Sequence, residues 1–260
     1  MTLVNMESFI EKLATQAGEA ILPFFRTSLS VADKAEKAAF DPVTEADRAG
    51  ESIIRARLKE HLPQHGIIGE EFGAENADAE YVWVIDPIDG TRSFICGIPL
   101  WGTLIGLLRN GKPVLGVMNQ PYTGELFIGT GGSAQFKRGT QTRTLTTRAC
   151  ANLSDAYLAT TSPLIFDEAH KARYDAVAAQ TRLARYGTDC YAYCMLAAGQ
   201  IDLVVEAGLK PYDIVALIPI IEGAGGVVTT WDGGPAQNGG AIVAAGDRRV
   251  HEQALKILKG

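Results

Sequence analysis

The stretch Trp83-Val-Ile-Asp86-Pro-Ile-Asp89-Gly-Thr91 carries the strongest signal in this chain of 260 residues. An apolar run typical of a buried strand leads into Asp86, and Pro87 is expected to end that strand. Gly90 then permits a tight turn. Two carboxylates three residues apart at a strand end can point into the same space, where their charges repel unless a cation neutralises them. Because Mg²⁺ prefers oxygen ligands, the pattern predicts an open magnesium site.

Three other stretches place acids where they could join this site. Ile67-Ile-Gly-Glu70-Glu71 is a second apolar strand that ends in paired acids, and Glu70 would face Asp86 if the two strands were neighbours. Thr44-x-x-Asp47 also fits a capping box, and Asp213 could simply cap the helix that it opens. For any one acid a solvated turn or a helix cap is a sufficient explanation. Two acid pairs, each at the end of an apolar strand, favour a metal site.

The composition narrows the class of function. The chain has 24 Lys and Arg against 30 Asp and Glu, a net charge of −6, which predicts no general attraction to nucleic acid or to anionic membranes. We find no apolar stretch near the roughly 20 residues that span a bilayer and no signal-peptide pattern. The four cysteines form no CxxC pair, so they are interpreted as reduced thiols of a cytoplasmic protein, with Cys190 and Cys194 buried.

Apolar periodicity predicts two helices, at 5–28 and 44–62, the first ended or kinked by Pro23. An antiparallel meander with hairpin turns at Asn110-Gly111 and Thr123-Gly124 follows. Its strands are expected at 66–69, 81–86, 103–108, 114–119, 125–129 and 134–137.

The later part alternates strands with helices, which predicts layered sheets and helices in an α/β (α+β) fold. The strands are expected at 157–161, 183–186, 201–206, 226–231 and 241–245, and the helices at 166–181, 190–198, 213–223 and 248–258. We expect one domain over 1–260, with a soft division into a metal-binding half, 1–145, and a substrate-side half, 146–260.

Four motifs in order resemble those of the inositol monophosphatase family. They are Asp41-Pro-Val-Thr-Glu-Ala-Asp47, Gly69-Glu-Glu71, Asp86-Pro-Ile-Asp-Gly-Thr91, and Tyr212-Asp213 with Glu222-Gly-Ala-Gly-Gly226. The resemblance covers nearly the whole chain. It implies a layered α-β-α-β-α sandwich of the sugar-phosphatase type, a homodimer, and magnesium-dependent hydrolysis of a small phosphorylated metabolite.

The resemblance also implies a role for each site residue, with about two to three Mg²⁺ per active site. The metal ligands would be Glu70, Asp86, the backbone carbonyl of Ile88, Asp89 and Asp213. Glu70, Thr91 and Asp47 would be catalytic, with Thr91 and Asp47 orienting the attacking water. The backbone N–H groups of Gly90 and Thr91 would hold phosphate oxygens.

Two residues depart from the family pattern beside these motifs. Tyr212 stands where Trp is common, which is a mild change between large aromatic side chains. Arg92 follows Thr91 where a small or polar residue is frequent. It adds a cation that could touch substrate or a neighbouring subunit, or it could be a surface arginine.

Substrate choice is expected to depend on Gly187-Thr188-Asp189-Cys190 and on Glu206. Asp189 stands where inositol phosphatases commonly have Ala, and Glu206 falls at the family's substrate-binding acid. Two carboxylates favour a cation between them. The segments 186–193 and 205–213 resemble the bacterial histidinol-phosphatases of the family. The implied substrate-binding residues are Gly90, Thr91, Arg92, Thr188, Asp189, Glu206 and Asp213.

The sequence therefore predicts a histidinol-phosphatase of histidine biosynthesis, which converts L-histidinol phosphate to L-histidinol and phosphate. Asp189 could instead be the N-cap of the helix at 190–198. One alternative function is that of an inositol-1-monophosphatase or a broad-specificity monophosphatase. A non-catalytic regulatory protein is the alternative from a different class, and the intact set of acids argues against it.

Overall fold

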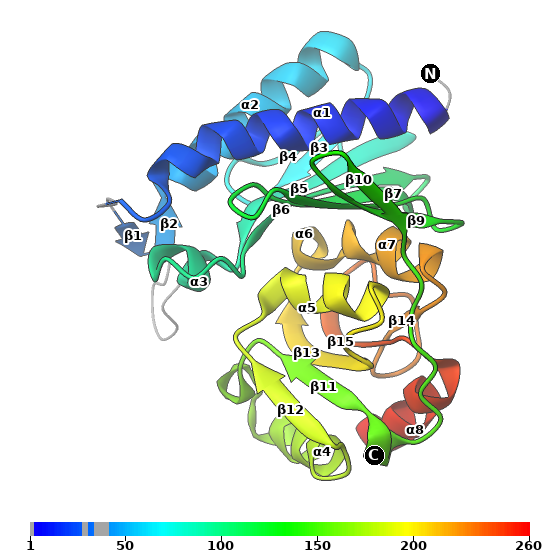
Figure 1. Ribbon diagram of the computed structural model, residues 1–260. Coiled ribbons are helices and arrows are strands. Elements are labelled where there is room, and N and C mark those ends of the chain that lie inside the picture. The colour runs from blue at the N-terminus through cyan, green and yellow to red at the C-terminus, as the bar shows by residue number, and fades with distance from the viewer. Residues whose placement is uncertain (1–2, 28–30, 34–41) are drawn as a thin grey trace.

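The computed structural model describes residues 3–27, 31–33 and 42–260, and these form alternating layers of helices and sheets (Figure 1). Helices α1 (Leu3–Ile21) and α2 (Glu45–His61) lie on the outer face of one sheet. The central layer contains α5 (Asp189–Ala197), α6 (Pro211–Ile214) and α7 (Leu217–Gly223), and a second sheet separates it from α4 (Glu168–Ala178) and α8 (Arg248–Leu258). The predicted α-β-α-β-α sandwich is confirmed.

The first sheet has eight strands in the order β10-β9-β8-β7-β6-β5-β3-β4. Their bounds are β3 (Gly66–Gly69), β4 (Gly73–Glu75), β5 (Tyr81–Asp89), β6 (Gly102–Arg109), β7 (Lys112–Gln120), β8 (Glu125–Gly129), β9 (Ala134–Arg138) and β10 (Gln141–Thr144). The predicted antiparallel meander is confirmed from β5 to β9, but β3 pairs with β5 in parallel. The Asn110-Gly111 hairpin is confirmed, because both residues have the positive φ that a two-residue turn requires.

Strand β5 does not end at Pro87, as its sequence suggested, but continues to Asp89. Asp86 is paired with Leu104 and Asp89 with Gly102, so β5 contains one more residue than β6 between these two pairs. This extra residue makes a β-bulge, and a bulge tolerates a proline because the ladder is already interrupted there.

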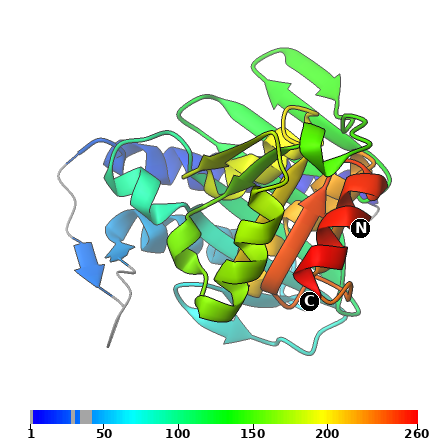
Figure 2. The ribbon, with the colours of Figure 1, turned by 90° about the horizontal axis from the view of Figure 1, so that it is seen from below.

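The second sheet has five strands in the order β12-β11-β13-β15-β14. Their bounds are β11 (Tyr157–Thr160), β12 (Leu183–Tyr186), β13 (Leu203–Leu209), β14 (Val227–Thr230) and β15 (Gly240–Ala245). Strand β11 is parallel to both of its neighbours, whereas β15 is antiparallel to β13 and β14. Seen from below, α4 and the red α8 lie across this sheet (Figure 2).

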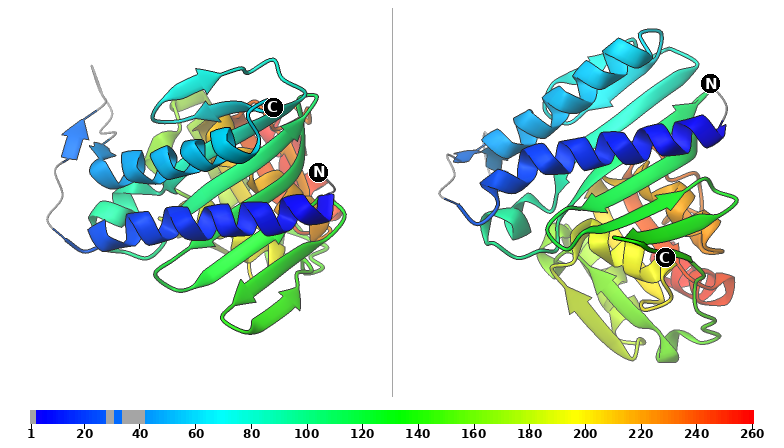
Figure 3. Two further views of the ribbon diagram at one scale, coloured as in Figure 1. Left: turned by 90° about the horizontal axis from the view of Figure 1, so that it is seen from above. Right: turned by 45° about the horizontal axis from the view of Figure 1, so that its top comes forward.

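The predicted helices differ from the observed ones mainly at their ends. Helix α1 ends at Ile21, and a short 3₁₀ turn at Leu22–Phe24 contains Pro23. The helix expected at 213–223 is two helices, α6 and α7. Helices α1 and α2 run side by side over the first sheet (Figure 3).

Several short elements were not predicted: β1 (Val31–Asp33), β2 (Pro42–Thr44), α3 (Thr91–Ile95), β4, β10, and 3₁₀ turns at Leu153–Asp155 and Pro163–Ile165.

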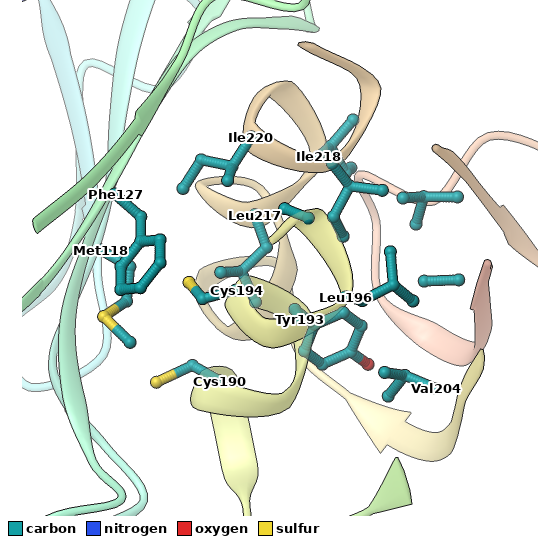
Figure 4. Packing of buried hydrophobic residues seen from close by; sticks show 14 of the residues in the cluster. Met118, Phe127, Cys190, Tyr193, Cys194, Leu196, Val204, Leu217, Ile218 and Ile220 are labelled. Atoms are coloured by element: carbon teal, nitrogen blue, oxygen red, sulfur yellow. The ribbon is translucent and has the colours of Figure 1, made fainter. Parts of the chain in front are cut away.

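The core between the first sheet and the central helices fixes the position of α5 and α7. Figure 4 shows Phe127 and Met118 of the sheet facing side chains of these two helices. Cys190 and Cys194 lie in this cluster as buried free thiols, as predicted.

A row of three glycines lets the central helices approach the first sheet closely. Gly106, Gly116 and Gly129 are cross-strand neighbours on β6, β7 and β8. A Cβ atom at any of the three would come within 3.0 Å of atoms of the segment 215–220. This row of glycines therefore sets the distance of α6 and α7 from the sheet, and α6 packs against β5.

We predict that Gly116→Ala destabilises the protein by about 2 to 3 kcal/mol, because the added methyl group overlaps the backbone oxygen of Ala216. Urea unfolding measures this difference. Gly132→Ala is the matched control, since a Cβ atom there meets nothing within 4 Å. Equal unfolding midpoints for the two variants would contradict the close packing of α7 on the sheet.

Candidate functional site

The parallel pairing of β3 and β5 brings two of the predicted acids together. Gly69 is level with Ile85, so the residues that follow, Glu70 and Asp86, emerge side by side at the same sheet edge. The backbone N–H of Glu70 also donates to the carbonyl of Ile85 at 3.2 Å. Strands β3 and β5 are therefore neighbours, which is the condition predicted from the sequence for Glu70 to face Asp86.

Asp86, Asp89 and Asp213 place carboxylate oxygens that all lie within 4.8 Å of one another. Asp86 is buried, whereas the other two side chains are half-buried. Asp47, in the first turn of α2, is also buried, and its charge acts on Asp86. Acids from α2, the end of β3, β5 and α6 therefore meet in one place.

The bulge in β5 explains how Asp86 and Asp89 point the same way. Residues three apart in a regular strand face opposite sides of the sheet, because the side-chain period is two. The one extra residue shifts this alternation and returns Asp89 to the side of Asp86. The N–H of Ile88 donates to Asp86 Oδ1 at 3.0 Å, and the hydroxyl of Thr91 donates to the Ile88 carbonyl at 3.1 Å.

Backbone N–H groups also orient the other two carboxylates. The N–H of Cys190, in the first turn of α5, donates to Asp89 Oδ2 at 2.6 Å. The N–H of Lys210 donates to Asp213 Oδ2 at 2.6 Å, so Asp213 does cap the start of α6, as one interpretation of the sequence held. The Asp213 side chain therefore both caps α6 and belongs to the acid cluster.

The cluster is electrostatically unfavourable without a cation. Burial raises the pKa of Asp86, and the charges of Glu70, Asp89, Asp213 and Asp47 raise it further. Burial likewise raises the pKa of Asp89, with the charges of Asp189 and Asp213 adding to it. Carboxylates that raise one another's pKa values fit a hard divalent cation such as Mg²⁺, because the cation attracts each of them and offsets their mutual repulsion.

A pocket of about 160 Å³ lies directly beside the cluster. It is lined by Asp89, Thr161, Ile165, Asp189, Cys190, Tyr193, Glu206, Ala207, Leu209 and Asp213. Four of these ten residues are carboxylates, and two of the four also belong to the acid cluster. The pocket and the candidate metal centre are therefore parts of one site.

Asp189 is held in the pocket and is not the N-cap of α5. Helix α5 begins at Asp189 itself, and its N-cap is Thr188. The hydroxyl of Ser93 donates to Asp189 Oδ2 at 3.0 Å, and Asp189 has a φ of 42°, a left-handed conformation that costs energy outside glycine. Burial raises its pKa, while Ser93, Thr161 and the charge of Arg92 lower it. Arg92 is exposed, yet it is close enough to act on Asp189.

Glu206 is the second pocket acid that does not belong to the cluster. Only 3% of it is exposed, and its Oε1 accepts bonds from the N–H of Thr161 at 2.6 Å and the hydroxyl of Thr161 at 2.8 Å. Burial raises the pKa of Glu206 to about 7 against the effect of these bonds. The hydroxyl of Tyr193 is buried with no hydrogen-bond partner among the described residues.

The remaining predicted residues lie around this site. Gly90 is the N-cap of α3, and its φ of 86° is accessible to glycine. Its backbone approaches Asp189 so closely that a Cβ atom would lie 3.2 Å from the Asp189 side chain. Thr188 lies outside the pocket lining, with a buried hydroxyl oxygen. Asp41 falls outside the described residues.

Sequence reasoning missed the supporting residues Ser93, Thr161, Tyr193 and Glu51. Tyr193 stood in the segment 186–193 but was given no role, and Ser93 and Thr161 reach the acids of the pocket through tertiary contacts. Glu51 had a signal in the sequence, because it lies four residues after Asp47 and therefore on the same side of the helix predicted at 44–62.

The comparison with protein families agrees with this geometry. The model of the inositol monophosphatase family matches residues 3–259. The chain belongs to the inositol monophosphatase family. It is a phosphatase of that family, whose members generally depend on Mg²⁺.

The relatives of this chain include phosphatases named for two different substrates. It is 45% identical to the bifunctional phosphatase IMPL2, chloroplastic, of Arabidopsis thaliana, over 95% of this chain and 73% of the relative. It is 37% identical to a histidinol-phosphatase of Chlorobaculum parvum, over 83% of this chain and 82% of the relative. It also resembles the structure of an inositol monophosphatase from Zymomonas mobilis, with a TM-score of 0.89, 41% identity and 100% coverage of both chains.

Among the residues that the structure describes, no helix is both long enough and apolar enough to cross a membrane.

We predict that Asp86→Asn raises the melting temperature in EDTA at neutral pH and reduces the stabilisation by Mg²⁺. Folding raises the pKa of Asp86, so its negative charge destabilises the folded state once the pH exceeds the pKa of this group in the unfolded chain. Asn carries no such charge. Mg²⁺ at 100 times its Kd should stabilise the wild type by about 2.7 kcal/mol.

Thermal melts with and without Mg²⁺ measure both effects. Asp78→Asn is the control, because Asp78 is an exposed acid in the turn between β4 and β5. An equal Mg²⁺ response in wild type and Asp86→Asn would show that no cation binds at the cluster.

Proposed function

We propose that this phosphatase hydrolyses L-histidinol phosphate to L-histidinol and phosphate, in histidine biosynthesis and in the cytoplasm. The observation that supports it is the pocket beside the acid cluster, whose lining contains four carboxylates. L-histidinol phosphate carries an ammonium group and an imidazole next to its phosphate. A substrate with cationic groups offsets the like charges of this pocket, which a neutral polyol does not do.

The residues proposed to hold Mg²⁺ are Glu70, Asp86, the carbonyl of Ile88, Asp89 and Asp213. The pairing of Glu70 with Asp86 and the grouping of the three aspartates support this set. The Ile88 carbonyl accepts a bond from Thr91 and has a second lone pair available. About two to three bound ions would neutralise the phosphoryl oxygens and lower the pKa of the attacking water.

Thr91 and Asp47 are proposed to orient the attacking water. Because the proton of the Thr91 hydroxyl is directed to the Ile88 carbonyl, its oxygen is left to accept a hydrogen bond from water. Asp47 is buried at the edge of the cluster, where a carboxylate can take up the proton that the water releases. The N–H groups of Gly90 and Thr91, at the start of α3, are proposed to hold phosphate oxygens.

Asp189 and Glu206 are proposed to bind the cationic end of the substrate. Both are held by hydroxyl groups, so their carboxylates are oriented before the substrate arrives. Thr188 precedes Asp189 at the start of α5 and is proposed to support it. Arg92, whose charge acts on Asp189, is proposed to contact the substrate phosphate from the exposed side.

The alternative within the family is hydrolysis of inositol 1-phosphate or of many monoesters. The similarity to the inositol monophosphatase of Zymomonas mobilis favours it. A non-catalytic regulatory role is a weaker alternative, because it gives no reason for an acid cluster whose members raise one another's pKa values.

We predict Mg²⁺-dependent phosphate release with a kcat/KM for L-histidinol phosphate at least about tenfold above that for inositol 1-phosphate. Asp189→Asn and Glu206→Gln should each reduce this ratio by about tenfold while largely retaining the rate on inositol 1-phosphate, because only the cationic substrate loses an ion pair. Parallel phosphate-release assays with both substrates give the ratio.

The control for catalysis is Asp86→Asn, which should lower kcat by several orders of magnitude with both substrates. A wild-type preference for inositol 1-phosphate would overturn the histidinol assignment. Phosphate release that is equal in wild type and Asp86→Asn would overturn the active site itself.

A homodimer is proposed for the assembly, with one contact at the edge strand β12. Leu183 and Tyr186 of β12 are exposed, and Leu164, in the turn after β11, is 91% exposed. Apolar side chains gathered at an open sheet edge favour association with another chain.

We predict sedimentation at twice the chain mass for the wild type and a shift to the single-chain mass for Leu164→Glu. The exposed Leu164 makes this change harmless to the isolated fold. Gln141→Glu, on the exposed strand β10, adds the same charge elsewhere and should leave the mass unchanged. A single-chain mass for the wild type would contradict the proposed dimer.

A further inference from the structure

A buried ion pair lies on the inner face of α2, outside the site described above. Glu51 Oε1 accepts a bond from Arg55 Nε at 2.7 Å. The Glu51 side chain is 0% exposed and that of Arg55 is 7% exposed. Removing two such charges from water is costly, so a pair of this kind needs further hydrogen bonds to be tolerated.

Those further bonds go to the turn that follows Glu70. Glu51 Oε2 accepts the N–H of Glu71 at 2.8 Å, and Oε1 accepts the N–H of Phe72 at 3.2 Å. The guanidinium of Arg55 donates to the carbonyl of Gly73 and, at 2.8 Å, to Glu75 Oε1. The pair therefore holds three successive backbone groups directly after Glu70.

The approach between Glu51 and this turn is close. A Cβ atom at Gly69 would come within 3.0 Å of the Glu51 carboxylate. Glycine at this position thus allows Glu51 to lie against the backbone on both sides of Glu70, at Gly69 and at Glu71.

The same face of α2 also reaches the acid cluster. Asp47, Glu51 and Arg55 are spaced four residues apart, which places them along one side of the helix. Asp47 acts on Asp86, and Glu51 holds the turn beside Glu70. Because Arg55 balances the charge of Glu51, this support adds no net negative charge next to the cluster.

We propose that Glu51, paired with Arg55, is a positioning residue for metal binding, which holds the turn 70–73 so that Glu70 stays beside Asp86. The like charges of Glu70 and Asp86 repel each other, and a turn without this support would let Glu70 move away before a cation arrives. This inference rests on the proposed function, in which Glu70 binds Mg²⁺.

The test is Glu51→Gln, which keeps the size of the side chain. Oε1 accepts bonds from Arg55 and Phe72 and Oε2 from Glu71, so the amide NH₂ faces two donors if it replaces Oε1 and one if it replaces Oε2. We expect the Kd for Mg²⁺, measured by calorimetry without substrate, to rise about tenfold or more. At saturating Mg²⁺, kcat should return to within about threefold of the wild type, because Glu51 touches no reacting group.

Asp202→Asn is a matched control for the loss of a buried acid. Asp202 is buried, pairs with Arg148 and accepts the N–H of Tyr157 at 2.7 Å, but it lies at the second sheet. A comparable fall in melting temperature is expected in both variants measured in EDTA, with weaker Mg²⁺ binding in Glu51→Gln alone. Weaker binding in both would indicate a general structural effect and overturn the proposal.

Arg55→Lys provides a second variant if Glu51→Gln does not fold. It keeps the positive charge but loses the planar arrangement that joins Glu51, Gly73 and Glu75, and the Kd for Mg²⁺ should rise about threefold. A wild type that binds Mg²⁺ and hydrolyses substrate, with an unchanged Kd in both α2 variants, would overturn this inference alone. A wild type that binds no Mg²⁺ would overturn the proposed function.

Discussion

Repulsion among buried carboxylates is the constraint to which the rest of this structure responds. Burial and four neighbouring acids raise the pKa of Asp86, so the fold must hold these groups together against their own charges. Backbone N–H groups do much of this: those of Ile88, Cys190 and Lys210 donate to Asp86, Asp89 and Asp213 respectively. Because these donors belong to the main chain, they fix the direction of each carboxylate without ordering a second side chain.

The acids come from different layers, so the packing between layers determines the site. Asp213 belongs to α6, which reaches β5 because three glycines in register let the central helices approach the first sheet. Asp89 is tied to the first turn of α5 in the same layer. A change in the spacing of these layers would therefore separate the acids even though none of them had been replaced.

The sequence predicted the layered fold and the acids that meet, because strand ends and glycine turns are local signals. It failed where tertiary contacts override local preference. Pro87 indicated a strand end, but β5 continues through a bulge, and this bulge is what aligns Asp86 with Asp89. Asp189 had the sequence position of a helix cap, yet Ser93, almost a hundred residues away in the chain, holds it in the pocket. Thr161 could not be found at all, and Tyr193 could not be told from its neighbours in the segment 186–193, since no periodicity marks a pocket wall.

The sharing of Asp89 and Asp213 between the cluster and the pocket gives the proposed function a physical basis for selectivity. The cations proposed for the cluster would neutralise these two carboxylates together with Asp86 and attract the phosphate. Asp189 and Glu206 would then remain as the acids of the pocket, of about 160 Å³, that do not belong to the cluster. A substrate with a phosphate at one end and a cation at the other matches both signs in one orientation. A phosphate of a neutral polyol matches only the first, and it leaves the buried Glu206 and the half-buried Asp189 without a counter-charge.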